Sequence, residues 1–158
     1  MEQKTCTFFG HRQCPEAVKP MLRAVIEDLI VCHGVTTFYV GNQGQFDFFV
    51  RGTLRQLEQE YPHIHYGVVL AYMPKKDEDH SDTMLPEGIE SVHPRYAITW
   101  RNRWMLDRAD FVVTYITHSW GGAAKFAQAA EKKEKTVINL GEKKETMFLN
   151  SLFAAHLL

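Results

Sequence analysis

The sequence predicts an α/β fold in which helices cover both faces of a mainly parallel, five-stranded sheet. Two observations lead to this prediction. Short runs rich in aromatic and β-branched residues alternate along the chain with longer stretches whose apolar residues recur at helical spacing. A glycine follows directly after several of the short runs, where the backbone has to turn from a strand toward a helix.

The first half of the chain contains two expected strand–helix pairs. Residues 5–10 form the first strand, and a helix follows within residues 15–34, where a glycine ends it. Residues 35–41 form the second strand, residues 42–47 a turn, and residues 48–61 the second helix. Each helix has one apolar side, which we expect to pack on the sheet.

The second half repeats this pattern after one interruption. The third strand, residues 65–74, is apolar enough for burial on both faces, as in a parallel sheet. Residues 75–94 are long, charged and proline-containing, which predicts a surface loop or a lid over a binding site. A helix over 95–108, a strand over 111–116, a helix over 122–133 and a strand over 136–140 complete the chain.

These strands and helices predict a Rossmann-like, doubly wound sheet, because each right-handed crossover between parallel strands covers one face. The whole chain, residues 1–158, is expected to form one domain with its core at about residues 5–140. The apolar tail, residues 146–158, is expected to pack on the body or on a second copy. The second possibility predicts a homo-oligomer, most simply a dimer.

Composition excludes several other classes of protein. The net charge of -1 disfavours a general nucleic-acid binder. No segment resembles a signal peptide, and no apolar run approaches the roughly 20 residues of a membrane helix, so we expect a cytoplasmic protein. The three cysteines and eight histidines lack metal-binding spacing, and we predict neither a metal nor a cofactor.

Ligands of open parallel sheets bind at the carboxyl ends of the strands, near the point where the strand order reverses. This rule selects the loops that follow the strands, together with the helix before the fourth strand. The candidate ligand-binding residues in these segments are Gly10, His11, Arg12, Gly41, Asn42, Gln43, Gly44, Asp47, Arg101, Arg103, Trp120, Gly121, Gly122, Ala123 and Ala124.

A phosphate site is predicted at Gly121 and Gly122, which open a helix whose free N–H groups favour an anion. A tight strand-to-helix turn without a ligand is the alternative explanation. Arg101 and Arg103 supply permanent positive charge and a planar fork of donors. Two positions apart on a helix, they point in different directions, so at most one is expected to face the site.

The candidate carboxylates are fewer. Asp47 can cap the second helix, accept hydrogen bonds from ribose hydroxyl groups, or act as a base. Glu87 and Glu90 are further candidates, with ordinary surface charges as the alternative. Trp120 immediately precedes the glycine pair and is the candidate for stacking on a nucleotide base.

The segments TCTFFGHR, FYVGNQGQFD, VVLAYMP, PEGIE, RNRWMLDRADFVVTYI, GGAAKF and KTVINL resemble a small bacterial and phage-associated branch of the SLOG superfamily. This superfamily is similar in fold to the DNA-processing protein DprA/Smf and to the lonely-guy (LOG) phosphoribohydrolases. The resemblance covers roughly residues 5–140 and implies a Rossmann-like sheet that binds a nucleotide-derived small molecule.

The resemblance also allows the loop after the fourth strand to be compared with the catalytic loop of the LOG enzymes. LOG enzymes carry a P-G-G-x-G-T-x-x-E loop whose glutamate serves N-glycosidic cleavage. Here Trp120 stands at the proline position, Ala124 at the third glycine, Lys125 at the threonine and Gln128 at the glutamate. We therefore expect a ligand-binding sensor or sequestering module. An N-glycosidase acting on a nucleoside 5′-monophosphate, with Asp47 or Glu87 as replacement carboxylate, is the alternative, and DprA-like nucleic-acid binding the third.

Overall fold

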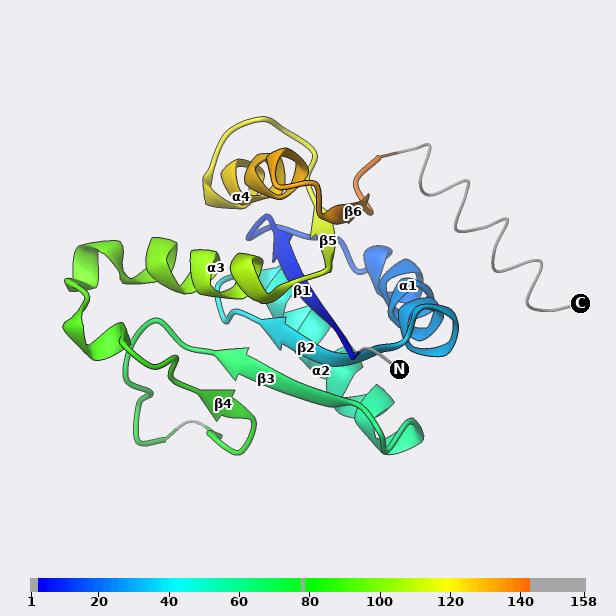
Figure 1. Cartoon of the computed structure of the whole chain (residues 1–158), viewed down its shortest axis with the longest axis horizontal. Helices are drawn as coiled ribbons and strands as arrows, with labels where there is room; N and C mark the ends of the chain where they lie inside the picture. The colour runs from blue at the N-terminus through cyan, green and yellow to red at the C-terminus, as the bar shows by residue number, and fades with distance from the viewer. Residues whose placement is uncertain (1–2, 78, 143–158) are drawn as a thin grey trace, which may run out of the picture.

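The computed structural model describes residues 3–77 and 79–142 of the chain. Its elements in chain order are β1 (Lys4–Gly10), α1 (Val18–His33), β2 (Val35–Val40), α2 (Gln45–Glu60), β3 (His65–Val69), β4 (Thr83–Met84), η1 (Ile89–Ser91), η2 (Pro94–Tyr96), α3 (Ala97–Arg108), β5 (Phe111–Tyr115), α4 (Gly122–Lys132) and β6 (Thr136–Asn139). The strands form one parallel sheet in the order β4-β3-β2-β1-β5-β6 (Figure 1). The predicted α/β fold is confirmed, with one strand more than expected.

Helices cover both faces of this sheet. α1 and α2 pack against each other on one face, and α3 and α4 do so on the other (Figure 1). Phe8 and Phe9 of β1 illustrate the division, because Phe8 belongs to the core beneath α1 and α2 and Phe9 to the core beneath α3 and α4. Successive side chains of a strand point to opposite faces, so the central strand contributes to both cores.

The strand order reverses at β1. The chain runs outward from β1 through β2 and β3 to β4, and then crosses back to place β5 on the other side of β1. The connections that leave β1 and β5 therefore go to opposite faces of the sheet, to α1 and α4 respectively. This arrangement opens a crevice above the carboxyl ends of β1 and β5, where doubly wound sheets bind their ligands.

The helix boundaries agree with the sequence to within two residues, except at the start of α2; α3 begins at Ala97 instead of residue 95, after the 3-10 turn η2. α1 ends as predicted at Gly34, whose φ of 70° is the left-handed conformation favoured at a helix end. α2 begins at Gln45, three residues before the expected residue 48, so the prediction was wrong at this end. Gly44 adopts a φ of 97° as the N-cap and completes the turn early.

Residues 75–94, expected to form a surface loop or a lid, contain β4, the one strand that the sequence did not predict. β4 pairs with the end of β3, and hydrogen bonds run from Val68 N to Asp82 O (2.8 Å) and from Leu70 N to Met84 O (2.9 Å). Two residues are too short for a periodic pattern, so the sequence carries no signal for this strand.

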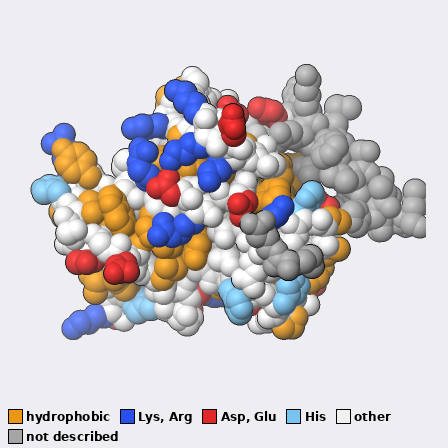
Figure 2. Space-filling view, in the orientation of Figure 1, with side chains coloured by type: hydrophobic (Ala, Val, Ile, Leu, Met, Phe, Trp, Pro, Cys, Tyr) orange, Lys and Arg blue, Asp and Glu red, His pale blue; other side chains and the backbone are white. Residues whose placement is uncertain are grey.

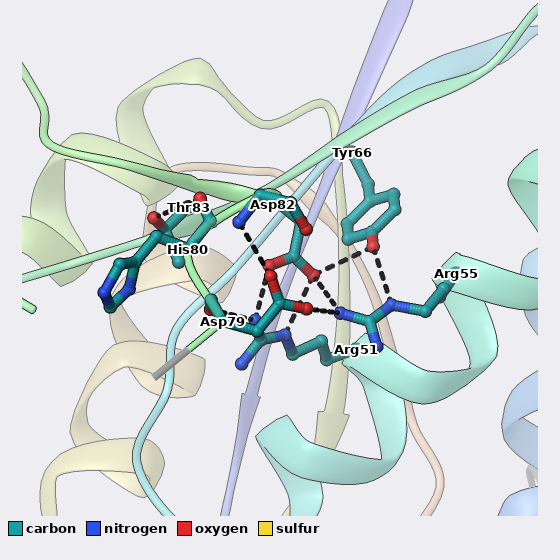
Figure 3. A network of polar contacts seen from close by, with 8 residues as sticks. Arg51, Arg55, Tyr66, Asp79, His80, Asp82 and Thr83 are labelled. Atoms are coloured by element: carbon teal, nitrogen blue, oxygen red, sulfur yellow. Dashed lines mark hydrogen bonds and ion pairs between the residues drawn. The ribbon is translucent and has the colours of Figure 1, made fainter. Parts of the chain in front are cut away.

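The segment before β4 is fixed by a network of charged groups (Figure 3). Arg51 of α2 donates from Nε to Asp82 Oδ2 (2.9 Å), and a second guanidinium nitrogen contacts Oδ1 of the same carboxylate. Arg55 (3.1 Å) and the Tyr66 hydroxyl group (2.9 Å) also donate to Asp82 Oδ2. Burial alone would raise the pKa of Asp82, but these partners outweigh it and hold the pKa at about 2.

The predicted apolar tail, residues 146–158, lies outside the described residues. Within the described residues, no helix has both the length and the apolar character needed to span a membrane.

Candidate functional site

A cavity of ≈ 520 Å³ opens above the carboxyl ends of β1 and β5, at the predicted place. The β1–α1, β2–α2 and β5–α4 connections contribute to its wall, together with one side of α3. The predicted residues that line it are Gly10, His11, Arg12, Gln43, Asp47, Arg101, Trp120, Gly121, Gly122 and Ala123. Segments separated by more than 100 residues in the chain thus meet in one hollow.

Arg101 and Asp47 form the buried polar end of the cavity. Their relative exposures are 1% and 8%, and Arg101 is among the largest fully buried side chains. Arg101 Nη1 donates to Val69 O (2.8 Å), and Arg101 Nε donates to the Asn102 side chain (2.8 Å). The guanidinium group is therefore held rigidly by backbone and side-chain acceptors while it borders the cavity.

Gly41 makes room for this pair. A Cβ atom on Gly41 would lie 3.0 Å from the Arg101 guanidinium group and 3.0 Å from Asp47 Oδ2. Gly41 itself does not line the cavity, so its contribution is to let the two charged groups approach from α3 and α2. Asn42, the next residue, also lies behind the wall and accepts from Arg101 Nη1 at 3.4 Å.

Asp47 lies inside the first turn of α2 rather than at its cap, because the helix starts earlier than predicted. Its Oδ2 accepts a hydrogen bond from the backbone N–H of Gln43 (2.9 Å), which tightens the turn ahead of the helix. Burial raises the pKa of Asp47 to about 6, although the Gln43 N–H group and the charge of Arg101 oppose the shift. A carboxyl group that titrates near neutral pH is suited to proton transfer.

The β1–α1 and β2–α2 connections are locked together. Gln45 N donates to Arg12 O (2.8 Å), and Cys14 N donates to the Gln45 side chain (3.0 Å). A Cβ atom on Gly44 would lie 2.5 Å from Arg12 Cα, so only glycine permits this crossing. Gly44 is therefore a supporting residue outside the cavity wall, and it places Arg12 on that wall.

The N-terminus of α4 opens into the cavity. Gly121 is the N-cap with a φ of 95°, and neither a side-chain cap nor an acidic residue occurs in the first turn. Gly122 and Ala123 line the cavity, and the first N–H groups of a helix have no acceptor within the helix itself. Such a helix end, with its partial positive charge, is a ready site for a phosphate.

Ala124 and Gln128 do not belong to this cavity. Ala124 is buried against the sheet, and both residues border a separate hollow of ≈ 110 Å³. Helical periodicity explains the difference, because the residues after Ala123 turn away from the cavity. Ala124, predicted to bind the ligand, is therefore not among the residues that line this cavity, and neither is Gln128, which stands at the position of the LOG glutamate.

Three aromatic rings stack along one wall. The ring centroid of His118 is 3.6 Å from that of His11 and 3.8 Å from that of Trp120. Thr117 N donates to His11 Nε2 (3.0 Å), which fixes the first ring. Trp120 is 69% exposed at the outer end of the stack. We did not predict His118, although it stands in the same loop as Trp120.

One side of α3 completes the wall, and most of it escaped the sequence interpretation. Ile98, Asn102 and Met105 line the cavity beside Arg101. Their positions recur at helical spacing with that of Arg101. Once Arg101 is placed at the site, these neighbours on the same side of the helix can be predicted to line it as well. Arg103 is exposed on another side of the helix, with its guanidinium carbon 6.0 Å from the ring centroid of Phe126. As expected from the spacing, only one of the two arginines faces the site.

Glu87 and Glu90 are not brought to the cavity. Both are exposed, and none of the described residues between 75 and 94 lines the cavity. The attachment of this segment to β3 and α2 through Asp82 favours the surface loop over the lid, the two alternatives that the sequence left open. Among the residues that the structure describes, no group of three or more His, Cys, Asp or Glu side chains is arranged to hold a metal ion.

No protein-family model matches the chain, and no curated protein matches it. Among solved structures, it is similar to the X-ray structure of DNA processing protein A (DprA) from Streptococcus pneumoniae, with a TM-score of 0.64 and 14% sequence identity. The match covers 86% of this chain and 50% of the DprA chain, so this chain spans half the length of that protein. At this identity the similarity shows a shared, DprA-like Rossmann-type fold.

Proposed function

We propose that this chain is a SLOG-type domain that binds a nucleotide or a nucleotide-derived ligand and acts as a sensor or sequestering module. The observation that carries the proposal is the uncapped N-terminus of α4, which opens into the same ≈ 520 Å³ cavity as the buried Arg101 and Asp47. This volume falls within the range of small-molecule sites, and convergent polar groups in a concave site are typical of ligand recognition.

The ligand's phosphate would bind at Gly121, Gly122 and Ala123. Backbone N–H groups supply the donors, and the absence of an acidic residue in the first turn leaves them without an internal competitor. Arg12 of the β1–α1 connection lines the same cavity and adds positive charge.

The sugar and the base would occupy the two remaining parts of the cavity. The Asp47 carboxylate and the Gln43 side chain offer groups that hydrogen-bond to ribose hydroxyl groups. The exposed Trp120 has one ring face against His118, which leaves the other for stacking on a base. A ligand with all three parts would therefore contact α2, the β5–α4 connection and the start of α4 together.

A thermal-shift screen tests the proposal with the full chain and a panel of mononucleotides, dinucleotides, ADP-ribose species and cyclic signalling nucleotides. A true ligand at about 100 times its Kd stabilises the native state by about 2.7 kcal/mol, which is readily detected. Each stabilising compound is then recovered and chromatographed, and recovery of intact compound supports a binding module. The proposal fails if no compound of the panel raises the melting temperature.

An N-glycosidase is the second candidate, because Asp47 is a buried carboxyl group on the cavity wall with a pKa raised to about 6. In this reaction Asp47 would take a proton from water as the water attacks the sugar C1′ atom. The bond from C1′ to the base nitrogen breaks, the base leaves with its electron pair and takes a proton from solvent, and Asp47 returns its proton to solvent. Chromatography of the same samples would then show free base and sugar phosphate, and Asp47→Asn would abolish both products.

DNA binding is the candidate suggested by the fold neighbour, a DNA processing protein. Figure 2 shows Lys and Arg side chains over α3 and α4, and Arg103, Arg108 and Lys125 are exposed on these helices. However, Arg101 is buried and does not belong to this surface, and the guanidinium carbon of Arg108 lies 3.8 Å from the ring centroid of Trp104. Binding of a labelled oligonucleotide that weakens steeply with salt would support this candidate over a mononucleotide site.

A further inference from the structure

His118 lies in the middle of a stack of three aromatic rings beside the N-terminus of α4. Its ring is inclined by 14° to that of His11 and by 18° to that of Trp120, so the three rings are nearly parallel. All three residues line the cavity. The stack holds the His118 ring in one orientation, four residues before the helix begins.

His11 accepts a hydrogen bond through its ring nitrogen Nε2. Thr117 N–H donates to His11 Nε2, which requires a lone pair on this nitrogen. Burial lowers the pKa of His11, and the charge of His118 lowers it further. His11 therefore stays neutral, whereas His118 Nδ1 is buried without a hydrogen-bond partner among the described residues, so His118 is the ring of the pair with a nitrogen free to accept a proton.

The groups that line the cavity together with this pair are mainly positive. They are the N-terminus of α4, Arg12 on the β1–α1 connection and Arg101 on α3, while Tyr115 of β5 meets His11 edge-on. Asp47 of α2 is the one carboxylate among the described residues that line the cavity. An imidazolium ion at His118 therefore lacks a nearby counter-charge until an anion occupies the site.

We propose that the cavity selects a dianionic terminal phosphate, a phosphomonoester rather than a phosphodiester, and that His118 takes up a proton when this group binds. This inference rests on the proposed phosphate site at α4. A phosphomonoester carries about 1.5 to 2 negative charges at pH 7 and three acceptor oxygens, whereas a diester carries one charge. The second charge stabilises the imidazolium ion, and binding is therefore coupled to protonation.

The test uses sulfate and methyl sulfate as probes, because sulfate keeps two charges and methyl sulfate one across the pH range of histidine titration. Any pH dependence then comes from the protein. We expect the affinity for sulfate to fall about tenfold between about pH 6 and pH 8, and methyl sulfate to bind about tenfold more weakly at pH 6. Calorimetry in buffers of different ionisation enthalpy should show uptake of up to about one proton per sulfate.

Asp47 also titrates in this range and would weaken anion binding as it ionises, so the measurement is made in Asp47→Asn as well as in the wild-type chain. The pH dependence should persist in Asp47→Asn and in His63→Gln, an exposed histidine outside the cavity, and disappear in Asp47→Asn/His118→Gln. Equal pH dependence with and without His118 would overturn the inference and leave the phosphate site intact. Failure to bind sulfate or inorganic phosphate at any pH would overturn both.

A second measurement keeps His118 unchanged, so its outcome does not depend on whether the His118→Gln variant folds. The ring signals of the histidines are followed by NMR between about pH 5 and pH 9 with and without saturating sulfate. The titration midpoint of one stacked histidine should move to higher pH when sulfate is bound. An unmoved midpoint in the presence of bound sulfate would contradict proton uptake.

Discussion

The guanidinium group of Arg101 and the carboxylate of Asp47 face each other across Gly41, where a Cβ atom would lie 3.0 Å from each. The two side chains come from helices on opposite faces of the sheet, α3 and α2. They meet only above the edge of the sheet, where the end of β2 has no side chain to separate them. The glycine therefore determines whether the polar end of the cavity can form.

Gly41→Ala tests this dependence. The added methyl group would push the Arg101 and Asp47 side chains apart, which should destabilise the fold by about 1–3 kcal/mol. Loss of the arrangement should also weaken binding of whichever nucleotide ligand the screen identifies by at least about tenfold. Chemical denaturation and a binding titration measure the two effects separately.

Gly52→Ala is the matched control, because a Cβ atom at Gly52 of α2 meets nothing within 4 Å. Here alanine should stabilise the helix by about 0.5–1 kcal/mol and leave ligand affinity unchanged. If Gly41→Ala binds ligand like Gly52→Ala, the spacing between Arg101 and Asp47 does not matter for recognition.

Asp47→Asn should stabilise the ligand-free protein at pH 7. The folded-state pKa of about 6 lies above the ordinary value of 3.8, so the native state retains this proton to higher pH than the unfolded chain. Stability is consequently lost as the pH rises from about 4 to about 6, by up to about 3 kcal/mol. Asparagine cannot ionise and avoids this loss.

Denaturation of both proteins at several pH values measures the effect of Asp47→Asn. The stability difference should be largest above about pH 7 and vanish below about pH 4, and the exposed Asp77→Asn should show no such trend. A variant that is less stable than the wild-type chain at pH 7 would show that the Asp47 carboxylate is instead stabilised by its surroundings.

The alternation of strands and helices was enough to predict the fold and the position of the cavity, because the carboxyl ends of parallel strands meet at one edge. The glycines that follow the strands and Trp120 could be predicted as site residues in the same way, because they lie in loops at this edge. Local patterns did not show that Gly44 closes the turn before α2 early, nor that Arg51 and Arg55 hold Asp82 beside β3. Both depend on contacts between segments far apart in the chain.

The His118 stack shows a further limit. A lone histidine in a loop carries no periodic signal, and its position between His11 and Trp120 follows from the β5–α4 connection folding over β1. Conversely, Ala124 was a candidate because it follows Gly121 and Gly122 at the start of a helix, but its side chain borders a different hollow. Loop membership alone does not define which side chains line a cavity.

Ala123→Asp should separate stability from binding at α4. A carboxylate in the first turn interacts favourably with the N-terminus of the helix, which should stabilise the protein by about 0.3–1 kcal/mol. The same carboxylate would occupy and repel the proposed phosphate site, so affinity for inorganic phosphate should fall at least tenfold, on the order of 1.4 kcal/mol.

Isothermal titration with inorganic phosphate and thermal denaturation provide both measurements for Ala123→Asp. Gln128→Asp is the control, because Gln128 is exposed on the same helix and borders the separate hollow. It should leave phosphate affinity unchanged. Undiminished phosphate binding by Ala123→Asp would move the phosphate site away from the start of α4.

Asp82→Asn should destabilise the attachment of β4 in a pH-dependent way. The folded-state pKa of Asp82 is about 2, below its ordinary value of 3.8, so the stability that its ionised form contributes is present above about pH 4 and lost toward pH 2. Asparagine cannot form the charged contacts with Arg51 and Arg55, and we expect a loss of about 2 kcal/mol at pH 7. The difference from the wild-type chain should shrink as the pH falls toward 2.

Asp79→Asn is the control, because it alters an exposed carboxylate of the same network. It should cost much less stability, since the ion pair of Asp79 with Arg55 is solvated. Thermal denaturation between pH 2 and pH 7 distinguishes the cases, and equal losses from the two variants would show that Asp82 is not the centre of the network. Because no described residue of this segment lines the cavity, ligand affinity of the folded Asp82→Asn protein should stay within about twofold of the wild-type value.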